Sequence, residues 1–186
     1  MPWIQNTSMS DVKRGTHRNP GPNAMLIQIC DPPGDFPEPH FTFQEVHQFQ
    51  FLDVERDTEV LDEEMRCSQT QADELVRLLQ HAQANDMNVV VHCHAGVCRS
   101  GAVCEVGVMI GFQDTYVFRS PNLLVKHGMM RNLGMLYDEQ EAHTINGVTL
   151  PSGLIVPAKA VDWTNDNEKV FTLAEARRER RLQGGE

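Results

Sequence analysis

The stretch "VVVHCHAGVCRSGAVCEVGVMI", Val89 to Ile110, decides the fold. It begins with a compact apolar run that lacks polar alternation, which is typical of a strand covered on both faces of a sheet. It ends with small and apolar residues on nearly every side, which predicts a buried helix. The glycine-containing loop "HAGVCRSG" between them therefore lies at the carboxyl end of a strand and the amino end of a helix, where α/β folds bind anions.

The segments around this stretch predict the rest of the sheet. "AMLIQIC", Ala24 to Cys30, is a short apolar strand that ends at the loop "DPPGDFPEP". "FTFQEVHQFQFLDV" contains a second strand, which we expect to end near Asp53. "SQTQADELVRLLQHAQAND" has apolar residues at helical spacing, with Ser68 and Thr70 as candidate N-caps. We expect an α/β fold with a central, mainly parallel sheet flanked by helices.

The length of 186 residues favours a single compact domain. Residues 1–23 contain "RGTHRNPGPN" and predict an irregular N-terminal segment. We assign residues 24–143 to the domain, with a last helix in "PNLLVKHGMMRNLGMLYDEQEA". Residues 144–186 form an extension of unknown role, in which we expect a hairpin at Asn146 and Gly147 and a short charged helix from about Leu173 to Arg181.

Composition narrows the class of partner. The formal charge is −10 and the pI is near 5.2, which argues against a nucleic-acid partner because binding to a phosphate backbone depends on clustered Lys and Arg. No apolar run is long enough to span a bilayer, and the first residues have neither the basic end nor the apolar stretch of a secretory signal. Five cysteines at uneven spacing favour reduced thiols. We therefore expect a cytoplasmic protein with no membrane partner; its oligomeric state is left open.

The loop has the residues that a nucleophile and an oxyanion need. If residues 94–99 curl with their amides inward, they form a nest of N–H donors, reinforced by the helix that begins near Arg99. Cys93 at the bottom of this nest is favoured as a thiolate. Arg99 can bind two phosphoryl oxygens through its planar fork. Gly96 suits the curl, and Ser100 can donate a hydrogen bond to the sulfur.

A metal site is the alternative explanation for this cluster of potential ligands, which comprises His92, Cys93, His94 and Cys98. Adjacent residues on a strand point to opposite faces, and the sequence has no second pair of ligands at zinc-finger spacing. We expect neither a metal nor a cofactor.

The segment "VHCHAGVCRSG" resembles the signature of the cysteine-dependent protein tyrosine and dual-specificity phosphatases. That pattern is His-Cys, two residues, Gly, two residues, Arg, and then Ser or Thr. The positions that match it are His92, Cys93, Gly96, Arg99 and Ser100. "RSPN", Arg119 to Asn122, is similar to an element of the compact dual-specificity group. The resemblance implies a protein tyrosine phosphatase-like fold and a phosphorylated protein as substrate.

The resemblance also implies a mechanism. Cys93 would attack phosphorus and form a phosphocysteine, while Arg99 and the loop formed by His94, Ala95, Gly96, Val97 and Cys98 would bind the phosphoryl oxygens. An aspartic acid after the preceding strand would protonate the leaving oxygen. Asp53 is the favoured candidate, Asp57 is the second, and Asp62 is the third.

Phosphotyrosine is the expected substrate, with phosphoserine and phosphothreonine beside it. Two alternatives stay open: a rhodanese-like sulfurtransferase, which also wraps a short loop around a cysteine, and a catalytically silent module that binds phosphorylated residues. Cys98 and Cys104 lie close to Cys93 in sequence, so oxidation could trap the nucleophile as a disulfide with either of them.

Overall fold

The computed structural model describes residues 1–54, 65–135, 144–145 and 148–149. The chain divides into two compact units, Met1–Asn132 and Leu133–Glu186. The first unit contains, in chain order, β1 (Trp3–Ser8), α1 (Met9–Arg14), β2 (Ala24–Cys30), β3 (Glu45–Gln50), α2 (Gln69–Ala84), β4 (Asn88–Cys93), α3 (Arg99–Met109), β5 (Gln113–Asp114) and α4 (Leu123–Asn132). In the second unit β6 (Thr144–Ile145) and β7 (Val148–Thr149) pair antiparallel, as the expected hairpin requires.

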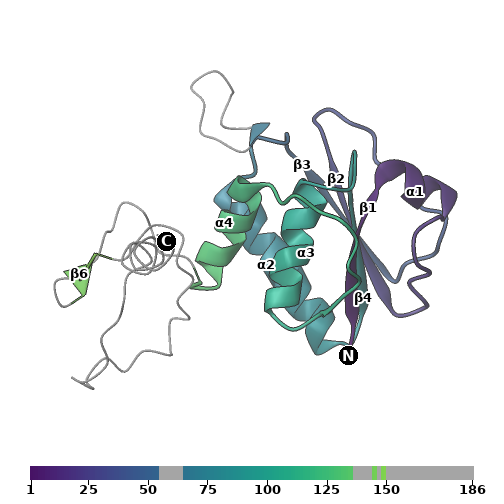
Figure 1. Cartoon of the computed structure of the whole chain (residues 1–186). Coiled ribbons are helices and arrows are strands. Elements are labelled where there is room, and N and C mark those ends of the chain that lie inside the picture. The colour runs from purple at the N-terminus through teal and green to yellow at the C-terminus, as the bar shows by residue number, and fades with distance from the viewer. Residues whose placement is uncertain (55–64, 136–143, 146–147, 150–186) are drawn as a thin grey trace, which may run out of the picture. The chain divides into compact units, whose positions relative to one another are not determined.

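The first unit is an α/β domain built on one parallel sheet with strand order β3-β2-β4-β1-β5. Helices α2, α3 and α4 cover one face of this sheet, and α1 lies on the other face (Figure 1). The strand that ends at Cys93, β4, is the central one, so the loop that follows it emerges from the middle of the sheet. This architecture confirms the predicted fold class.

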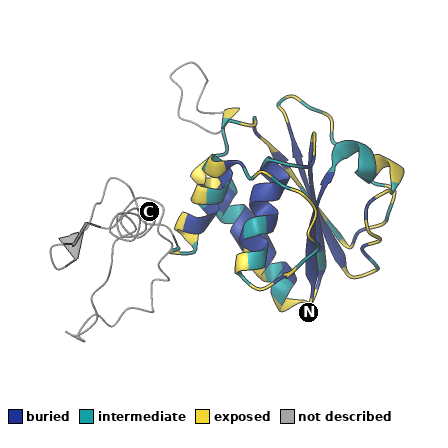
Figure 2. Ribbon diagram, in the orientation of Figure 1, coloured by how far each residue is buried: buried dark blue, intermediate teal, exposed yellow. Residues whose placement is uncertain are grey.

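Burial follows the predicted pattern (Figure 2). Every residue of β2 is buried, and so are the last five residues of β4. Helix α3 is buried over most of its length because it lies against β1 and β4. Helix α2 begins with the predicted N-cap, Ser68, whose side chain accepts a hydrogen bond from the Gln71 amide while the Gln71 side chain bonds back to the Ser68 amide.

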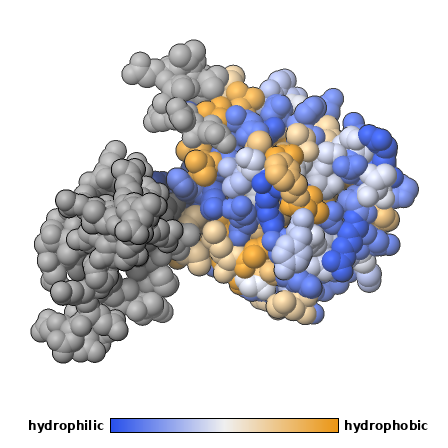
Figure 3. Space-filling model, viewed as in Figure 1, coloured by the Kyte–Doolittle hydropathy of each residue, from blue (hydrophilic) through white to orange (hydrophobic). Residues whose placement is uncertain are grey.

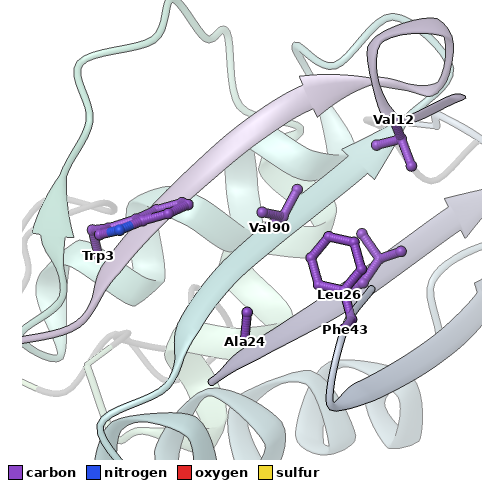
Figure 4. Packing of buried hydrophobic residues seen from close by; sticks show 6 residues of the cluster. All are labelled: Trp3, Val12, Ala24, Leu26, Phe43 and Val90. Atoms are coloured by element: carbon purple, nitrogen blue, oxygen red, sulfur yellow. The ribbon is translucent and has the colours of Figure 1, made fainter. Parts of the chain in front are cut away.

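The prediction of an irregular segment over residues 1–23 is wrong for residues 3–14. The strand β1 pairs with β4 on one side and β5 on the other, so it is an interior strand of the sheet. The polar run Gln5, Asn6 and Thr7 concealed it, because buried polar residues give no hydrophobic pattern. Trp3 and Val12 join a cluster with Ala24, Leu26, Phe43 and Val90 (Figure 4).

Two other expected boundaries differ from the structure. β3 ends at Gln50 rather than near Asp53, because the Leu52 amide turns away from the sheet and donates to the Met65 carbonyl. Helix α4 ends at Asn132, and Gly134 follows with φ +65°, a left-handed conformation that ends helices. The expected domain boundary at residue 143 and the expected helix from Leu173 to Arg181 lie outside the described residues.

The surface of the described part mixes residue types (Figure 3). Among its exposed large side chains are Tyr116 and Phe118, which are 89% and 76% exposed and belong to the segment between β5 and α4. No helix in the described ranges is long and apolar enough to cross a bilayer.

Candidate active site

The loop between β4 and α3 is held by the end of β1. Gly96 has φ +76°, and a Cβ atom there would lie 2.3 Å from the Thr7 carbonyl carbon. Only glycine allows both this left-handed conformation and this close approach of the two backbones. The curl that the sequence predicts at Gly96 is therefore present, and it depends on β1, which the sequence did not reveal.

The loop carbonyl oxygens are engaged from outside the loop. The bonds run from Met9 N–H to His94 O at 3.3 Å, from Asn6 Nδ2 to Gly96 O at 2.8 Å, from Ser120 N–H to Val97 O at 3.3 Å and from Asn122 N–H to Cys98 O at 3.1 Å. A peptide's N–H and C=O point in opposite directions, so carbonyls that bond outward turn amides towards the centre. This arrangement fits a nest for an oxyanion, placed at the amino end of α3.

Cys93 and Ser100 meet below the loop. The Cys93 Sγ lies 3.2 Å from the Ser100 Oγ, and both residues are buried. The Ser100 hydroxyl can donate to a thiolate at that distance. The expected proximity of the Cys93 sulfur and the Ser100 hydroxyl is thus present in the structure.

Arg99 is 3% exposed, and one nitrogen of its guanidinium group, Nη1, is held by hydrogen bonds. Its Nη1 donates to Asp31 Oδ1 at 2.5 Å and to the Phe51 carbonyl at 2.7 Å. Its Nε has no hydrogen-bond partner within the described part of the chain, and lies 3.9 Å from Asp53 Oδ2. The anchored Nη1 leaves the edge formed by Nε and Nη2 as the part that can bind two oxygens of an anion.

Asp31 is a site residue that sequence reasoning missed. It follows β2 in the segment "DPPGDFPEP", which indicated only a loop. The carboxyl ends of the parallel strands β2 and β4 lie at the same edge of the sheet, and this brings Asp31 beside Arg99. A polar residue directly after a strand is the signal that could have found it.

Asp53 is held by Asn122. The Asn122 Nδ2 donates to Asp53 Oδ1 at 2.7 Å and to the Val54 carbonyl at 3.1 Å. Asn122 is itself fully buried, and its Oδ1 accepts from the Val125 amide at 3.0 Å, which caps the first turn of α4. The structure therefore places Asp53 near Arg99, whereas Asp57 and Asp62 lie outside the described residues.

Burial shifts the pKa values of several titratable residues around Cys93. Burial lowers the pKa of His92 to about 4, so its ring is neutral at physiological pH. Burial raises the pKa of the Cys104 thiol inside α3, and it also raises that of Cys30 at the end of β2. None of the five cysteines, all of which lie in the described part of the chain, forms a disulfide bond. Nowhere in the described ranges do three His, Cys, Asp or Glu side chains gather as metal ligands would.

Comparison with known proteins gives one family match. Residues 52–110 match the family described as "Polymorphic toxin system, DSP-PTPase phosphatase". This range contains Asp53, Cys93, Arg99 and Ser100. No curated protein sequence matches the chain.

Two solved structures are similar at low identity. One is the tyrosine phosphatase OH1 from the Orf virus, with 22% identity, a TM-score of 0.40 and coverage of 59% of this chain and 57% of that one. The chain thus spans 57% of the length of that relative. The other is the human tyrosine phosphatase-like serine/threonine/tyrosine-interacting protein, with 16% identity, a TM-score of 0.49 and coverage of 70% and 91%. Residues 52–110, which contain the loop between β4 and α3, thus match a dual-specificity-type phosphatase family over part of the chain.

Proposed function

We propose that this protein is a protein phosphatase that hydrolyses phosphotyrosine, and also phosphoserine and phosphothreonine, through a phosphocysteine intermediate. The observation that carries the proposal is the arrangement of Cys93, Ser100 and Arg99 around one loop, with Sγ and Oγ 3.2 Å apart. The match of residues 52–110 to a phosphatase family supports the same reaction class. The reaction needs no metal or cofactor, and the partner is a phosphorylated protein.

In the first step the Cys93 thiolate attacks phosphorus in line. The S–P bond forms while the bond from phosphorus to the leaving oxygen breaks. The loop amides and the free edge of Arg99 bind the equatorial oxygens, where negative charge is greatest. Asp53, oriented by the buried Asn122 amide, gives its proton to the leaving oxygen.

In the second step water attacks the phosphocysteine. The Asp53 carboxylate takes a proton from the water, a new P–O bond forms and the S–P bond breaks. Cys93 leaves as a thiolate, which the Ser100 hydroxyl stabilises from 3.2 Å. Inorganic phosphate is released and the enzyme returns to its starting state.

We place this activity inside a cell, where reducing conditions keep the Cys93 thiol available. The family description names polymorphic toxin systems, and an enzyme of such a system that acts on the phosphoproteins of a cell is consistent with that placement.

The test is hydrolysis of p-nitrophenyl phosphate and of phosphotyrosine, phosphoserine and phosphothreonine peptides by the wild type, Cys93→Ser and Asp53→Asn. We expect no activity in Cys93→Ser, and for peptide leaving groups a loss of about 10²-fold to 10⁴-fold in kcat for Asp53→Asn. An assay with thiosulfate and cyanide runs in parallel. Sulfur transfer without phosphate release would establish a sulfurtransferase, and phosphopeptide binding without either reaction would establish a silent module.

A further inference from the structure

The peptide between Gly96 and Val97 is held by a side chain from β1. The Asn6 Nδ2 donates to the Gly96 carbonyl at 2.8 Å and to the Phe118 carbonyl at 3.0 Å. A carbonyl oxygen can only accept, so the NH2 group of the amide faces both partners. The C=O and N–H of one trans peptide point in opposite directions, and the bond to Gly96 therefore turns the Val97 N–H towards the centre of the loop.

Asn6 differs from the other groups that bind the loop carbonyls. The bonds described above to the carbonyls of residues 94, 97 and 98 come from backbone N–H groups, which every residue except proline supplies. Among these four bonds, only the one from Asn6 depends on the identity of a side chain. Asn6 is thus the position at which a substitution can release a loop peptide while the backbone of its partner is kept.

The Asn6 side chain has a fixed orientation. The residue is fully buried, and it pairs with Val91 of the central strand β4. Its Oδ1 has no hydrogen-bond partner among the described residues, so within that part of the chain its polar contacts run through the NH2 group. The two bonds of this group restrain rotation of the amide. A donor that is already oriented suits an oxyanion site, because no rearrangement is needed during the reaction.

The second bond of Asn6 supports a neighbouring peptide of the loop. Phe118 lies in the segment between β5 and α4, and two residues later the Ser120 N–H donates to the Val97 carbonyl at 3.3 Å. By the same geometry that bond turns the Cys98 N–H towards the centre of the loop. Loss of the Asn6 NH2 group would therefore affect two consecutive amides of the nest.

We propose that Asn6 is a positioning residue for oxyanion binding: its NH2 group orients the Gly96–Val97 peptide so that the Val97 N–H donates to a phosphoryl oxygen. Asn6 acts through the loop and not by contact with the phosphoryl group. The proposal rests on the proposed phosphatase function, to which it adds a requirement for a polar side chain within β1. An oriented donor stabilises the transition state more than the bound substrate, so its loss should lower kcat.

The test variant is Asn6→Leu, which keeps the size of the side chain and removes the donor. Asn6→Ala is a second test variant in case Asn6→Leu does not fold. The matched control is Asn23→Leu, because the Asn23 Nδ2 also bridges two carbonyls, those of Asn85 and Asp86, at 3.1 and 3.2 Å. Asn23 precedes the amino end of β2, whereas the loop follows the carboxyl end of the parallel strand β4, so the control lies at the opposite edge of the sheet.

Three measurements are made on each protein: kcat and KM with p-nitrophenyl phosphate, the Kd of inorganic phosphate by isothermal titration calorimetry, and the free energy of unfolding in urea. In the Asn6 variants we expect kcat to fall about 10-fold to 100-fold and the Kd of phosphate to rise about tenfold. Asn23→Leu should keep both quantities within about twofold of the wild type.

The proposal requires both changes in a folded Asn6 variant. A variant that keeps the wild-type kcat or the wild-type Kd of phosphate would overturn it, whatever its free energy of unfolding, because Asn6 would then serve stability alone. Equal losses in Asn23→Leu would overturn it as well. Absence of hydrolysis by the wild type would instead overturn the proposed function, and a higher Kd of phosphate in Asn6→Leu would then still support the role of Asn6 in the loop.

Discussion

At the scale of single residues, the site is defined by which groups fix Arg99. The guanidinium is 3% exposed, and its Nη1 is bound by Asp31 at 2.5 Å, although the Asp31 side chain is itself 52% exposed. A charge buried this far is costly unless it is paired. We therefore expect Asp31 to act as a positioning residue, which holds the guanidinium in place when no oxyanion is bound.

The replacement Asp31→Asn removes the charge and keeps the side-chain shape. We expect the free energy of unfolding to fall by about 1 kcal/mol, since the partner is half exposed. A bound oxyanion supplies the missing negative charge, so inorganic phosphate should raise the Tm of the variant by more than it raises that of the wild type. Thermal unfolding with and without phosphate measures both effects. An equal Tm shift in the two proteins would show that Asp31 does not balance the charge of Arg99.

His92 should make stability depend on pH. Its pKa is about 4 in the folded protein because it is buried, against an ordinary value near 6.5. The unfolded chain therefore binds the proton first as pH falls, so stability is complete above about pH 6.5 and decreases towards pH 4. The pKa of His17 is lowered in the same direction by burial.

Urea unfolding at a series of pH values tests this dependence. Between about pH 6.5 and pH 4, the free energy of unfolding of His92→Gln should decrease less steeply than that of the wild type. The difference in slope should equal the contribution of one proton. An unchanged slope in that variant would mean that His92 is accessible to protonation in the folded state.

At the scale of elements, the strand β4, the loop after it and the helix α3 could be predicted from the sequence. The strand β1, which supports this loop, could not. Valines 89–91, the glycine at 96 and the buried residues of α3 each give a local signal. β1 gives none, because Gln5, Asn6 and Thr7 are polar yet buried where they pair with β4. Asp31 was missed for a related reason, since only strand order brings it to Arg99.

Two glycines with the same φ of +76° provide a test of how β1 supports the loop. A Cβ at Gly96 would meet the Thr7 backbone at 2.3 Å, whereas a Cβ at Gly21 would have no atom within 4 Å. Gly21→Ala should cost only the left-handed conformation, about 1–2 kcal/mol, and keep kcat. Gly96→Ala should cost more and lower kcat at least 100-fold by displacing the loop amides. Urea unfolding and p-nitrophenyl phosphate turnover give both quantities, and equal effects of the two replacements would refute the role of β1.

At the scale of the whole molecule, the first residues of the chain supply an interior strand of the sheet. β1 lies between β4 and β5 in the sheet, and Asn6 bonds to the loop carbonyl of Gly96. The sheet and its helices all belong to the unit Met1–Asn132. The fold therefore depends on its first eight residues, which the sequence pattern assigned to an irregular segment.

Two truncations test this division. A chain that lacks residues 1–8 should lose cooperative unfolding and all phosphatase activity, because β4 and α3 lose their shared neighbour. A chain that ends after residue 135 should unfold cooperatively and keep at least half of the kcat of the full chain on p-nitrophenyl phosphate. A twofold loss of kcat corresponds to a rise of about 0.4 kcal/mol in the activation free energy. Circular dichroism and turnover measure the outcome. Loss of activity in the second chain alone would show that residues after 135 take part in the site.

The central claim is that Cys93 becomes phosphorylated during turnover. Rapid acid quench of the full chain with a phosphotyrosine peptide, followed by peptide mass spectrometry, measures this directly. The account predicts one phosphoryl group on Cys93, formed faster than or as fast as phosphate is released, and none in Cys93→Ser. Steady phosphate release without a phosphoryl group on Cys93, or with one on another residue, would contradict it.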